Sequence, residues 1–483
     1  MNKSYIDSIY YLEYKKIRNK IRKYDSILLL NRCIEFLNDP KIEIVRKLPW
    51  HVLLLIKWIF VDDQFPQTTK INPSKKDLEK LINDINRIEG EVIKYQKFDN
   101  LHILLKRFAY QQFYYQERFN IFAFARQLIL FGDLEKNHYF KKIFFKKTGL
   151  NIHEFIKNSN YLLHHINNKG YYHISSNILN EQNFKAYLRV ISLDLASVNK
   201  WVKQVSKKER EPSEFYEPTM LLRYPLIEID EKYYIYHKNL LNRSLEYFIY
   251  DVLKMDNPNL SMSKFGIIFE NYIDKLISYS GVNYIRENEL TNIIGNKSKI
   301  VDFIIQQGES SILVDAKGVE MHYRGKTSLD PDFIKGKIKT SAIKAIEQAF
   351  ASIHELRKVE SYKFMNKFNN NYLLVVTYKE LFLGNGIEFE QRIGKDFFRK
   401  IRKEYGDELY IPLQNIYFIT VDSLEFWVEM VNKNKITFLD VLRNAIECDS
   451  DSSTQKFHFQ QHLEGMEIEL DAPDFIYKSF KEL

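Results

Sequence analysis

Cysteine is nearly absent from this chain of 483 residues, which contains only Cys33 and Cys448. The two cysteines are far apart in the sequence and lack the spacing of metal ligands. The sequence therefore excludes a disulfide framework of the kind found in small secreted domains. We expect a protein of the reducing cytoplasm.

Long apolar runs, glycine and proline are also scarce. The longest apolar stretch, residues 52–61, is interrupted by Lys57 and is too short to span a bilayer. The first residues lack the apolar core of a signal peptide, so we expect no membrane association. With 16 glycines, 11 prolines and 45% hydrophobic residues, the chain predicts two or three packed domains and no large disordered tract.

Several motifs of nucleic-acid enzymes are missing as well. The sequence contains no Walker A pattern, no zinc finger and no evident helix-turn-helix. The sequence therefore predicts neither a nucleotide-driven motor domain nor a recognised DNA-binding motif. The net charge is +8, a modest excess that is compatible with a polyanionic partner.

Changes in periodicity and composition along the chain predict a multidomain protein. Helical periodicity dominates the first half, including an aromatic segment at residues 101–131 that we interpret as core rather than as a base-stacking surface. A polar stretch at residues 207–217 is the best candidate linker. The expected domains are a helical sensor or specificity domain at 1–220, a connecting hairpin and helix at 221–260, an α/β domain at 261–446 and an acidic extension at 447–483. We interpret the extension as solvated, with a partner segment or a mimic of nucleic acid as alternatives.

The segment at residues 300–318 organises the second half. Two runs of β-branched and aliphatic residues, 299–305 and 311–316, flank a turn at 307–310, which predicts a β-hairpin. If the turn leaves Gln306 opposite Ser311, Asp302 lies directly across from Asp315.

Two carboxylates facing each other inside a sheet repel, and each is costly to bury without a partner. The Cβ atoms of opposed residues lie roughly 4.5–5.5 Å apart. A divalent cation between Asp302 and Asp315 removes both penalties, and Mg²⁺ is commonly held by one or two carboxylates. We therefore expect Mg²⁺ here, with Mn²⁺ as a substitute. The two-residue period places Lys317 on the same face as Asp315.

An amphipathic helix is predicted at residues 265–277, upstream of the hairpin. Glu270 lies at the edge of its apolar stripe. Gly266, one turn earlier, is expected to allow close approach to the sheet.

This order of a helical Glu, a strand Asp and an Asp-x-Lys strand resembles the PD-(D/E)xK nuclease superfamily, whose fold is restriction-endonuclease-like. The matching residues are Glu270, Asp302, Asp315 and Lys317. One position departs from the pattern, because Val301 rather than proline precedes Asp302. A literal Pro-Asp, at residues 331–332, follows the Asp-x-Lys and is in the wrong strand order to supply the first ligand.

The resemblance implies a metal-dependent phosphodiesterase. Asp302 and Asp315 are then direct ligands, and Glu270 is a further ligand or holds metal-bound water. Lys317 orients the attacking water or stabilises the charge of the transition state. The expected strands near residues 282, 299, 311, 372 and 414 make a mixed central sheet flanked by helices, as the resemblance requires.

Basic residues after Lys317 are expected to bind nucleic acid. The loop at 319–333 leaves the strand beside the predicted site. A long helix is predicted at 334–356 with lysines in its first half, where the helix dipole disfavours cations and a phosphate backbone would compensate. The resemblance also implies that this helix brings Lys344 or Gln348 to the site. The predicted nucleic-acid-binding residues are Arg324, Lys326, Lys335, Lys337, Lys339, Lys344 and Gln348.

Three functions follow as hypotheses. The first is a nuclease that hydrolyses DNA, with the N-terminal half acting as a sensor or docking module for a protein or a phage-derived trigger, as in bacterial anti-phage defence. The second is an RNase that cleaves tRNA as a growth-arresting toxin. The third is a catalytically inactive scaffold that binds nucleic acid or a partner protein.

Overall fold

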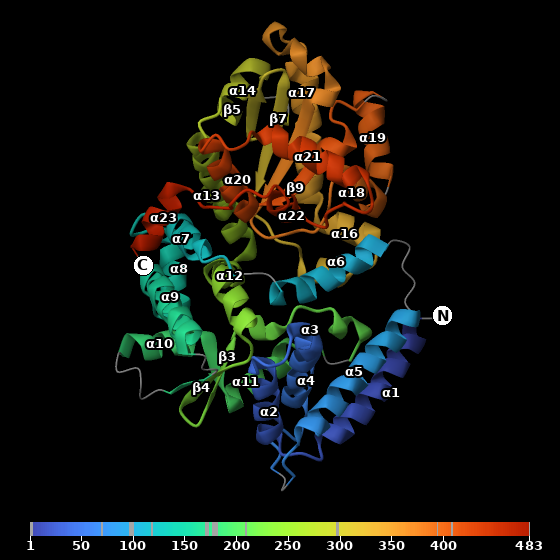
Figure 1. Cartoon of the computed structure of the whole chain (residues 1–483), viewed down its shortest axis with the longest axis vertical. Helices are drawn as coiled ribbons and strands as arrows, with labels where there is room; N and C mark the ends of the chain where they lie inside the picture. The colour runs from blue at the N-terminus through green and yellow to red at the C-terminus, as the bar shows by residue number, and fades with distance from the viewer. Residues whose placement is uncertain are drawn as a thin grey trace. The chain divides into compact units, whose positions relative to one another are not determined.

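The computed structural model describes the chain in segments. They are residues 3–68, 71–95, 101–116, 119–169, 173–175, 182–207, 210–295, 299–393, 395–406 and 409–482. The fold is mixed α/β and mostly helical, with two small mixed sheets. The chain divides into two compact units, Met1–Leu253 and Lys254–Glu482. Figure 1 shows their elements coloured along the chain.

The first unit is mostly helical, and its helices follow in chain order. These are α1 (Lys3–Ile21), α2 (Ser26–Asn38), α3 (Ile44–Lys47), α4 (Pro49–Val61), α5 (Lys75–Tyr95), α6 (Leu101–Gln112), η1 (Phe113–Tyr115), α7 (Phe122–Gln127), η2 (Leu128–Gly132), α8 (Tyr139–Thr148), α9 (Ile152–Lys169), α10 (Gln182–Ile191), α11 (Leu195–Val205), η4 (Pro212–Phe215), η5 (Met220–Leu222) and α12 (Lys238–Asp256), the last of which runs into the second unit.

A four-stranded sheet also belongs to this unit, in the order β1-β4-β3-β2. Its strands are β1 (His173–Ser175), β2 (Ser192–Asp194), β3 (Leu226–Ile229) and β4 (Lys232–Ile235). The predicted hairpin around Asp230 and Glu231 is confirmed as β3 and β4, and both turn residues have positive φ. Residues 221–253 therefore lie in the first unit instead of forming a separate connecting module.

The candidate linker is also placed differently by the structure. In the described part of 207–217, Glu214 is buried and accepts hydrogen bonds from Tyr10 and Trp58. Phe215 is fully buried in the hydrophobic core of the unit. This segment is therefore anchored in the first unit.

The second unit is built on a five-stranded sheet in the order β5-β6-β7-β8-β9. The strands are β5 (Tyr284–Arg286), β6 (Phe303–Gln307), β7 (Ser310–Lys317), β8 (Asn371–Thr377) and β9 (Ile416–Thr420). β5, β6 and β7 pair antiparallel, whereas β7, β8 and β9 pair parallel. All seven residues of β8 are buried, as expected for a strand that helices cover on both faces.

Helices surround this sheet, as Figure 1 shows for α13, α17 and α20. They are α13 (Pro258–Tyr279), α14 (Glu287–Ile294), α15 (Tyr323–Thr327), α16 (Pro331–Lys337), η6 (Lys339–Ile343), α17 (Lys344–Leu356), η7 (Glu360–Asn366), η8 (Phe368–Asn370), α18 (Gly386–Ile393), α19 (Lys395–Tyr405), η9 (Leu413–Asn415), α20 (Val421–Asn432), α21 (Phe438–Ser450), α22 (Gln460–Glu464) and α23 (Asp474–Lys481).

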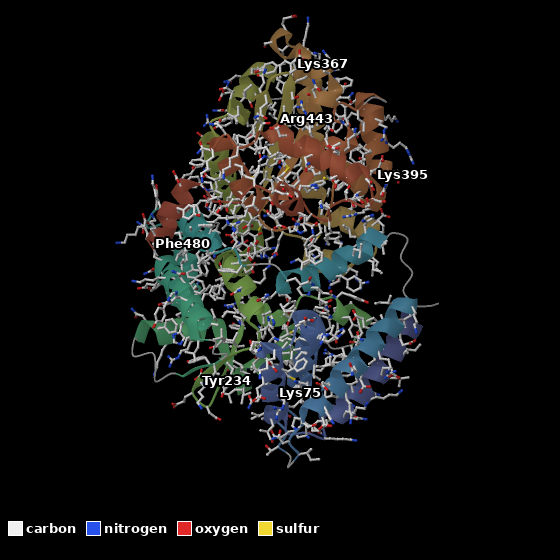
Figure 2. The ribbon with its side chains drawn as sticks, viewed as in Figure 1. Lys75, Tyr234, Lys367, Lys395, Arg443 and Phe480 are labelled. Atoms are coloured by element: carbon white, nitrogen blue, oxygen red, sulfur yellow. The ribbon has the colours of Figure 1, made fainter. Side chains whose placement is uncertain are left out.

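The hairpin has the register that the sequence predicts. Gln306 pairs with Ser311, and the two turn residues are Gly308 and Glu309. Gly308 has a φ of +60°, which suits the first position of a type II′ turn. Glu309 in the turn forms an ion pair with Lys367. Figure 2 labels Lys367.

Gly266 does not have the role that the sequence suggested. A Cβ atom on Gly266 would meet no other atom within 4 Å. The close approach occurs instead at Gly318, where an added Cβ would lie 2.9 Å from Cδ1 of Phe265 and 3.3 Å from Cβ of Phe269. The glycine that lets α13 pack against the end of β7 is therefore Gly318.

The acidic C-terminal segment is folded rather than solvated. Leu463 and Ile476 are fully buried. In α23, Phe475 packs edge-on against Tyr272 and Tyr279 of α13. The interpretation of 447–483 as a solvated extension is therefore wrong for its described residues.

Candidate active site

Three carboxylates from three separate segments of the chain meet at one end of the sheet. Glu270 lies in α13, Glu287 is the first residue of α14, and Asp302 immediately precedes β6. One carboxylate oxygen of each lies within 4.8 Å of the other two. This arrangement brings together oxygen ligands of the kind that Mg²⁺ prefers.

The backbone fixes two of these groups. The Glu287 amide donates a hydrogen bond to the carbonyl oxygen of Asp302 at 2.8 Å. The amide of Ala316, on β7, donates to Oδ2 of Asp302 at 2.6 Å. The ladder between β6 and β7 ends at Phe303 and Val314, so Asp302 lies just beyond the last strand pair.

Asp315 lies beside this group in β7. Its side chain is fully buried, and it forms an ion pair with Lys317 two residues further along the strand. The second oxygen, Oδ2, has no hydrogen-bond partner among the described residues. The Lys317 ammonium also donates to Oε1 of Gln348 in α17 at 3.2 Å. Gln348 in turn donates to the backbone carbonyl of Ile300.

The electrostatics of the site disfavour ionised carboxylates in the absence of a cation. Burial, followed by the Asp302 and Glu287 charges, raises the pKa of Glu270 to about 7. Burial and the Asp302 charge raise the pKa of Asp315 to about 7. The pKa values of Asp302 and Glu287 are also raised by burial. Lys317 acts in the opposite direction on all four groups, because a nearby positive charge favours each ionised form.

Glu287 is a site residue that the sequence alone did not reveal. The sequence suggested a strand over residues 282–290, but the strand ends at Arg286 and α14 begins at Glu287. Glu287 and Glu289 in the first turn are a helix-start signal that could have revealed this boundary.

The predicted nucleic-acid-binding residues fall into two groups. Gln348 touches Lys317, and the Lys344 charge lowers the pKa of both Asp302 and Asp315, so α17 presents both residues to the site. The other residues lie on the segment before α17, which is not the single helix expected at 334–356. It consists of α15, α16 and the π-helical turn η6.

This break changes the interpretation of the lysines. Lys335 and Lys337 occupy the last turn of α16, where the helix dipole favours cations, so the argument that they oppose the dipole is wrong. Lys339 is exposed in η6. Asp332, the literal Pro-Asp aspartate, is exposed in the first turn of α16.

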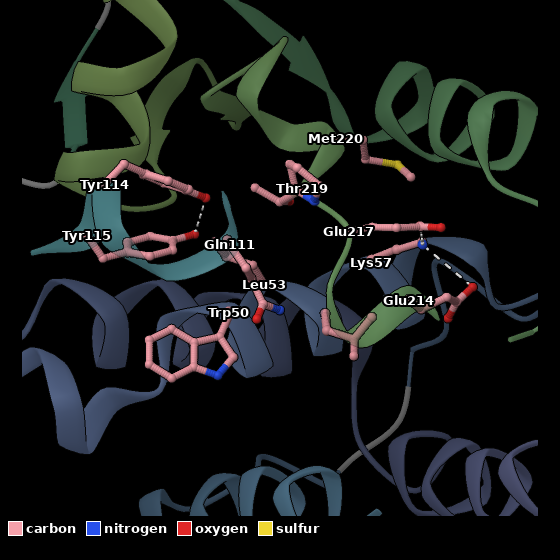
Figure 3. Close-up of a pocket in the computed structure, with 12 residues that line it drawn as sticks. Trp50, Leu53, Lys57, Gln111, Tyr114, Tyr115, Glu214, Glu217, Thr219 and Met220 are labelled. Atoms are coloured by element: carbon pink, nitrogen blue, oxygen red, sulfur yellow. Dashed lines mark hydrogen bonds and ion pairs between the residues drawn. The ribbon is translucent and has the colours of Figure 1, made fainter. Parts of the chain in front are cut away.

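A small hollow in the first unit does not suit a ligand. Its volume is about 30 Å³, which is room for about two water molecules. Figure 3 shows its cation, Lys57, between Glu214 and Glu217, which lie 3.5 and 3.6 Å from the ammonium. Glu214 also pairs with Arg210 at 2.7 Å and Glu217 with Lys207 at 3.2 Å, so the charged groups of this hollow already form a network of ion pairs.

Comparison of the chain with family models, curated proteins and solved structures finds no match. No helix among the described residues is long and apolar enough to cross a membrane.

Proposed function

We propose that the second unit is a nuclease that hydrolyses phosphodiester bonds with the help of a divalent cation. The observation that carries this proposal is the convergence of Glu270, Glu287 and Asp302 beside the ion pair of the buried Asp315 with Lys317. Asp302 and Asp315 are buried, whereas Glu270 is partly buried and Glu287 is exposed. Two carboxylates are seldom buried side by side without a cation, because each loses its hydration.

The residues present fit a hard divalent ion. The donors are carboxylate oxygens, and the fully buried Asp315 retains one oxygen without a hydrogen-bond partner among the described residues. Glu270, Glu287, Asp302 and Asp315 would hold Mg²⁺ or Mn²⁺. When bound, such an ion acts as a Lewis acid and lowers the pKa of a coordinated water.

The protein's own residues supply the remaining parts. Asp315 and Gln348 hold the Lys317 ammonium in one place, so that it is oriented before the substrate arrives. A fixed ammonium beside a phosphate stabilises the negative charge that develops during hydrolysis. Lys344, exposed at the start of α17, adds a second positive charge on the same side.

The topology supports the resemblance to the PD-(D/E)xK nucleases. A helix with the Glu precedes an antiparallel hairpin, Asp-x-Lys ends the second hairpin strand, and the following helix carries Gln348 to the site. The central sheet is mixed and lies among helices. We take DNA as the first substrate to test and RNA as the second.

The experiment that tests this proposal uses the purified full-length protein. It is incubated with plasmid, linear duplex DNA, single-stranded DNA and total tRNA, each with Mg²⁺, Mn²⁺ or a chelator. We expect cleavage of at least one substrate that depends on the metal. If none of the substrates is cleaved with either metal, the proposal is contradicted and an inactive scaffold is favoured.

A further inference from the structure

The loop that follows β7 presents an exposed aromatic platform. The Tyr323 side chain is 55% exposed, although large aromatic side chains are more often buried. Its ring centroid lies 4.7 Å from that of His322, and the Arg324 guanidinium lies 5.6 Å from the Tyr323 centroid. Nε of Arg324 donates to the Tyr323 hydroxyl at 2.8 Å. We call these three exposed residues the aromatic platform.

Three lysines surround one carboxylate in the same loop. Glu320 is 2.6 Å from Lys254, 3.4 Å from Lys326 and 3.2 Å from Lys379. Burial opposes ionisation of Glu320, but these charges outweigh it and hold the pKa of the carboxyl well below its usual range, so the carboxylate is ionised. We call these four residues the lysine cluster; its side chains carry three positive charges and one negative charge.

The platform and the cluster form one surface. Glu320 and His322 are two residues apart in the same loop, and Cβ of Lys337 lies 3.7 Å from the position that a Cβ atom on Gly325 would take. The amide of Lys379 donates to the carbonyl of Val319, which ties the end of β8 to the loop.

This surface is near the candidate active site. Glu320 follows Lys317 by three residues, and a fully extended chain spans at most about 3.6 Å per residue. The Cα atoms of Lys317 and Glu320 are therefore no more than about 11 Å apart.

We propose that the aromatic platform and the lysine cluster bind an unpaired nucleic-acid strand next to the site of cleavage. Tyrosine and histidine rings and guanidinium planes stack on unpaired bases, which a duplex keeps within its own stack. The lysines attract the phosphates of the same strand. This inference rests on the proposed nuclease function and assigns its substrate class: a single strand, or a duplex with an unpaired end or loop.

The test measures binding without cleavage. Wild-type protein in chelator is titrated into a fluorescein-labelled 20-nucleotide DNA strand, the matching duplex and an RNA strand of the same sequence, and anisotropy is recorded. We expect both single strands to bind more tightly than the duplex. Tyr323→Ala should weaken single-strand binding by about 5- to 150-fold, the range for loss of one stacked base. Tyr323→Phe should bind like wild type.

A matched control is available in the first unit. Tyr161 is 53% exposed and also stacks on a histidine, His165, so Tyr161→Ala removes a similar side chain elsewhere. This variant should bind like wild type. Equal affinity of wild type and Tyr323→Ala for the single strands, or tighter binding of the duplex, would overturn the inference.

The design separates this inference from the proposed chemistry. Binding that depends on Tyr323 in a protein that cleaves nothing would support the inference and contradict the nuclease. Cleavage that is unaffected by Tyr323→Ala, together with unchanged binding, would do the reverse. The comparison of DNA with RNA shows which strand is preferred.

Discussion

The Asp315 carboxylate lies in an environment that favours either a proton or a cation. It is fully buried in β7, one oxygen has no hydrogen-bond partner among the described residues, and the Asp302 charge is close by. Lys317 balances only part of this negative charge, because Glu270 and Glu287 add two more carboxylates. Metal ions and protons should therefore compete for this site.

This competition predicts how metal-induced stabilisation depends on pH. The pKa values of Glu270 and Asp315 are about 7 in the folded protein, above their unfolded values of about 4. Without metal, the free energy of unfolding should fall as the pH rises from about 4 to about 7, because the unfolded state then releases protons more readily. The metal binds the ionised carboxylates, so the rise in Tm with Mn²⁺ should be larger at about pH 8 than at about pH 5.5. Thermal unfolding at both pH values, with and without Mn²⁺, measures this. An equal rise in Tm at both pH values would contradict the assignment.

Glu287 provides a second prediction at this scale. Glu287→Gln keeps the size of the side chain but removes one charge from the three-carboxylate group. Metal affinity should fall by about 10- to 100-fold or more, as it does when a group that supports a metal is lost. Isothermal titration with Mn²⁺ measures this change. Glu289→Gln, two residues away and also exposed, is the control and should bind like wild type.

At the scale of elements, the packing of α13 on β7 makes Gly318 and Gly266 unequal. Gly318→Ala places a Cβ atom 2.9 Å from the buried ring of Phe265, and should destabilise the protein by about 1–3 kcal/mol. Gly266→Ala meets nothing within 4 Å and should stabilise α13 by about 0.5–1 kcal/mol. Urea unfolding of both variants tests the pair. The opposite order would show that α13 approaches the sheet at Gly266.

The basic segment between β7 and α17 gives a prediction about binding. Replacing Lys335, Lys337 and Lys339 with glutamine should weaken nucleic-acid binding without changing the fold, since all three are at least partly exposed. For a single strand, the slope of log K against log salt should flatten by about 0.7 for each phosphate that the protein no longer neutralises. An unchanged slope would identify these lysines as an ordinary solvated face.

The hairpin could be predicted because the residues that determine it are close together in the sequence. The apolar runs and the turn at Gly308 set the register, and the structure confirms the pairing of Gln306 with Ser311. The contribution of Glu287 could not be predicted in the same way. It depends on where β5 ends and on a backbone hydrogen bond to Asp302, a residue 15 positions later. The break before α17 could not be predicted either. Residues 334–356 keep an apolar stripe through the π-helical turn, so the sequence pattern resembles that of one continuous helix.

For the whole molecule, the division at residue 253 assigns the candidate chemistry to one unit. The five-stranded sheet and all four carboxylates lie in Lys254–Glu482. A fragment that begins at Asn257, the N-cap of α13, keeps these elements. We expect it to unfold in one cooperative transition and to be stabilised by Mn²⁺, by about 2.7 kcal/mol at a metal concentration of about 100 times Kd. A fragment that shows no cooperative transition would indicate that the site depends on the first unit.

The central claim is that Asp315 takes part in metal-dependent phosphodiester cleavage. The most direct measurement compares the single-turnover cleavage rate of wild type, Asp315→Asn and Asp332→Asn with Mn²⁺ in parallel preparations. We predict that the cleavage rate of Asp315→Asn is lower than that of wild type by at least about 100-fold, as is typical when a group that stabilises the transition state is removed. Asp332→Asn, which changes an exposed aspartate in the first turn of α16, should cleave like wild type. Cleavage by Asp315→Asn at the wild-type rate would contradict the claim.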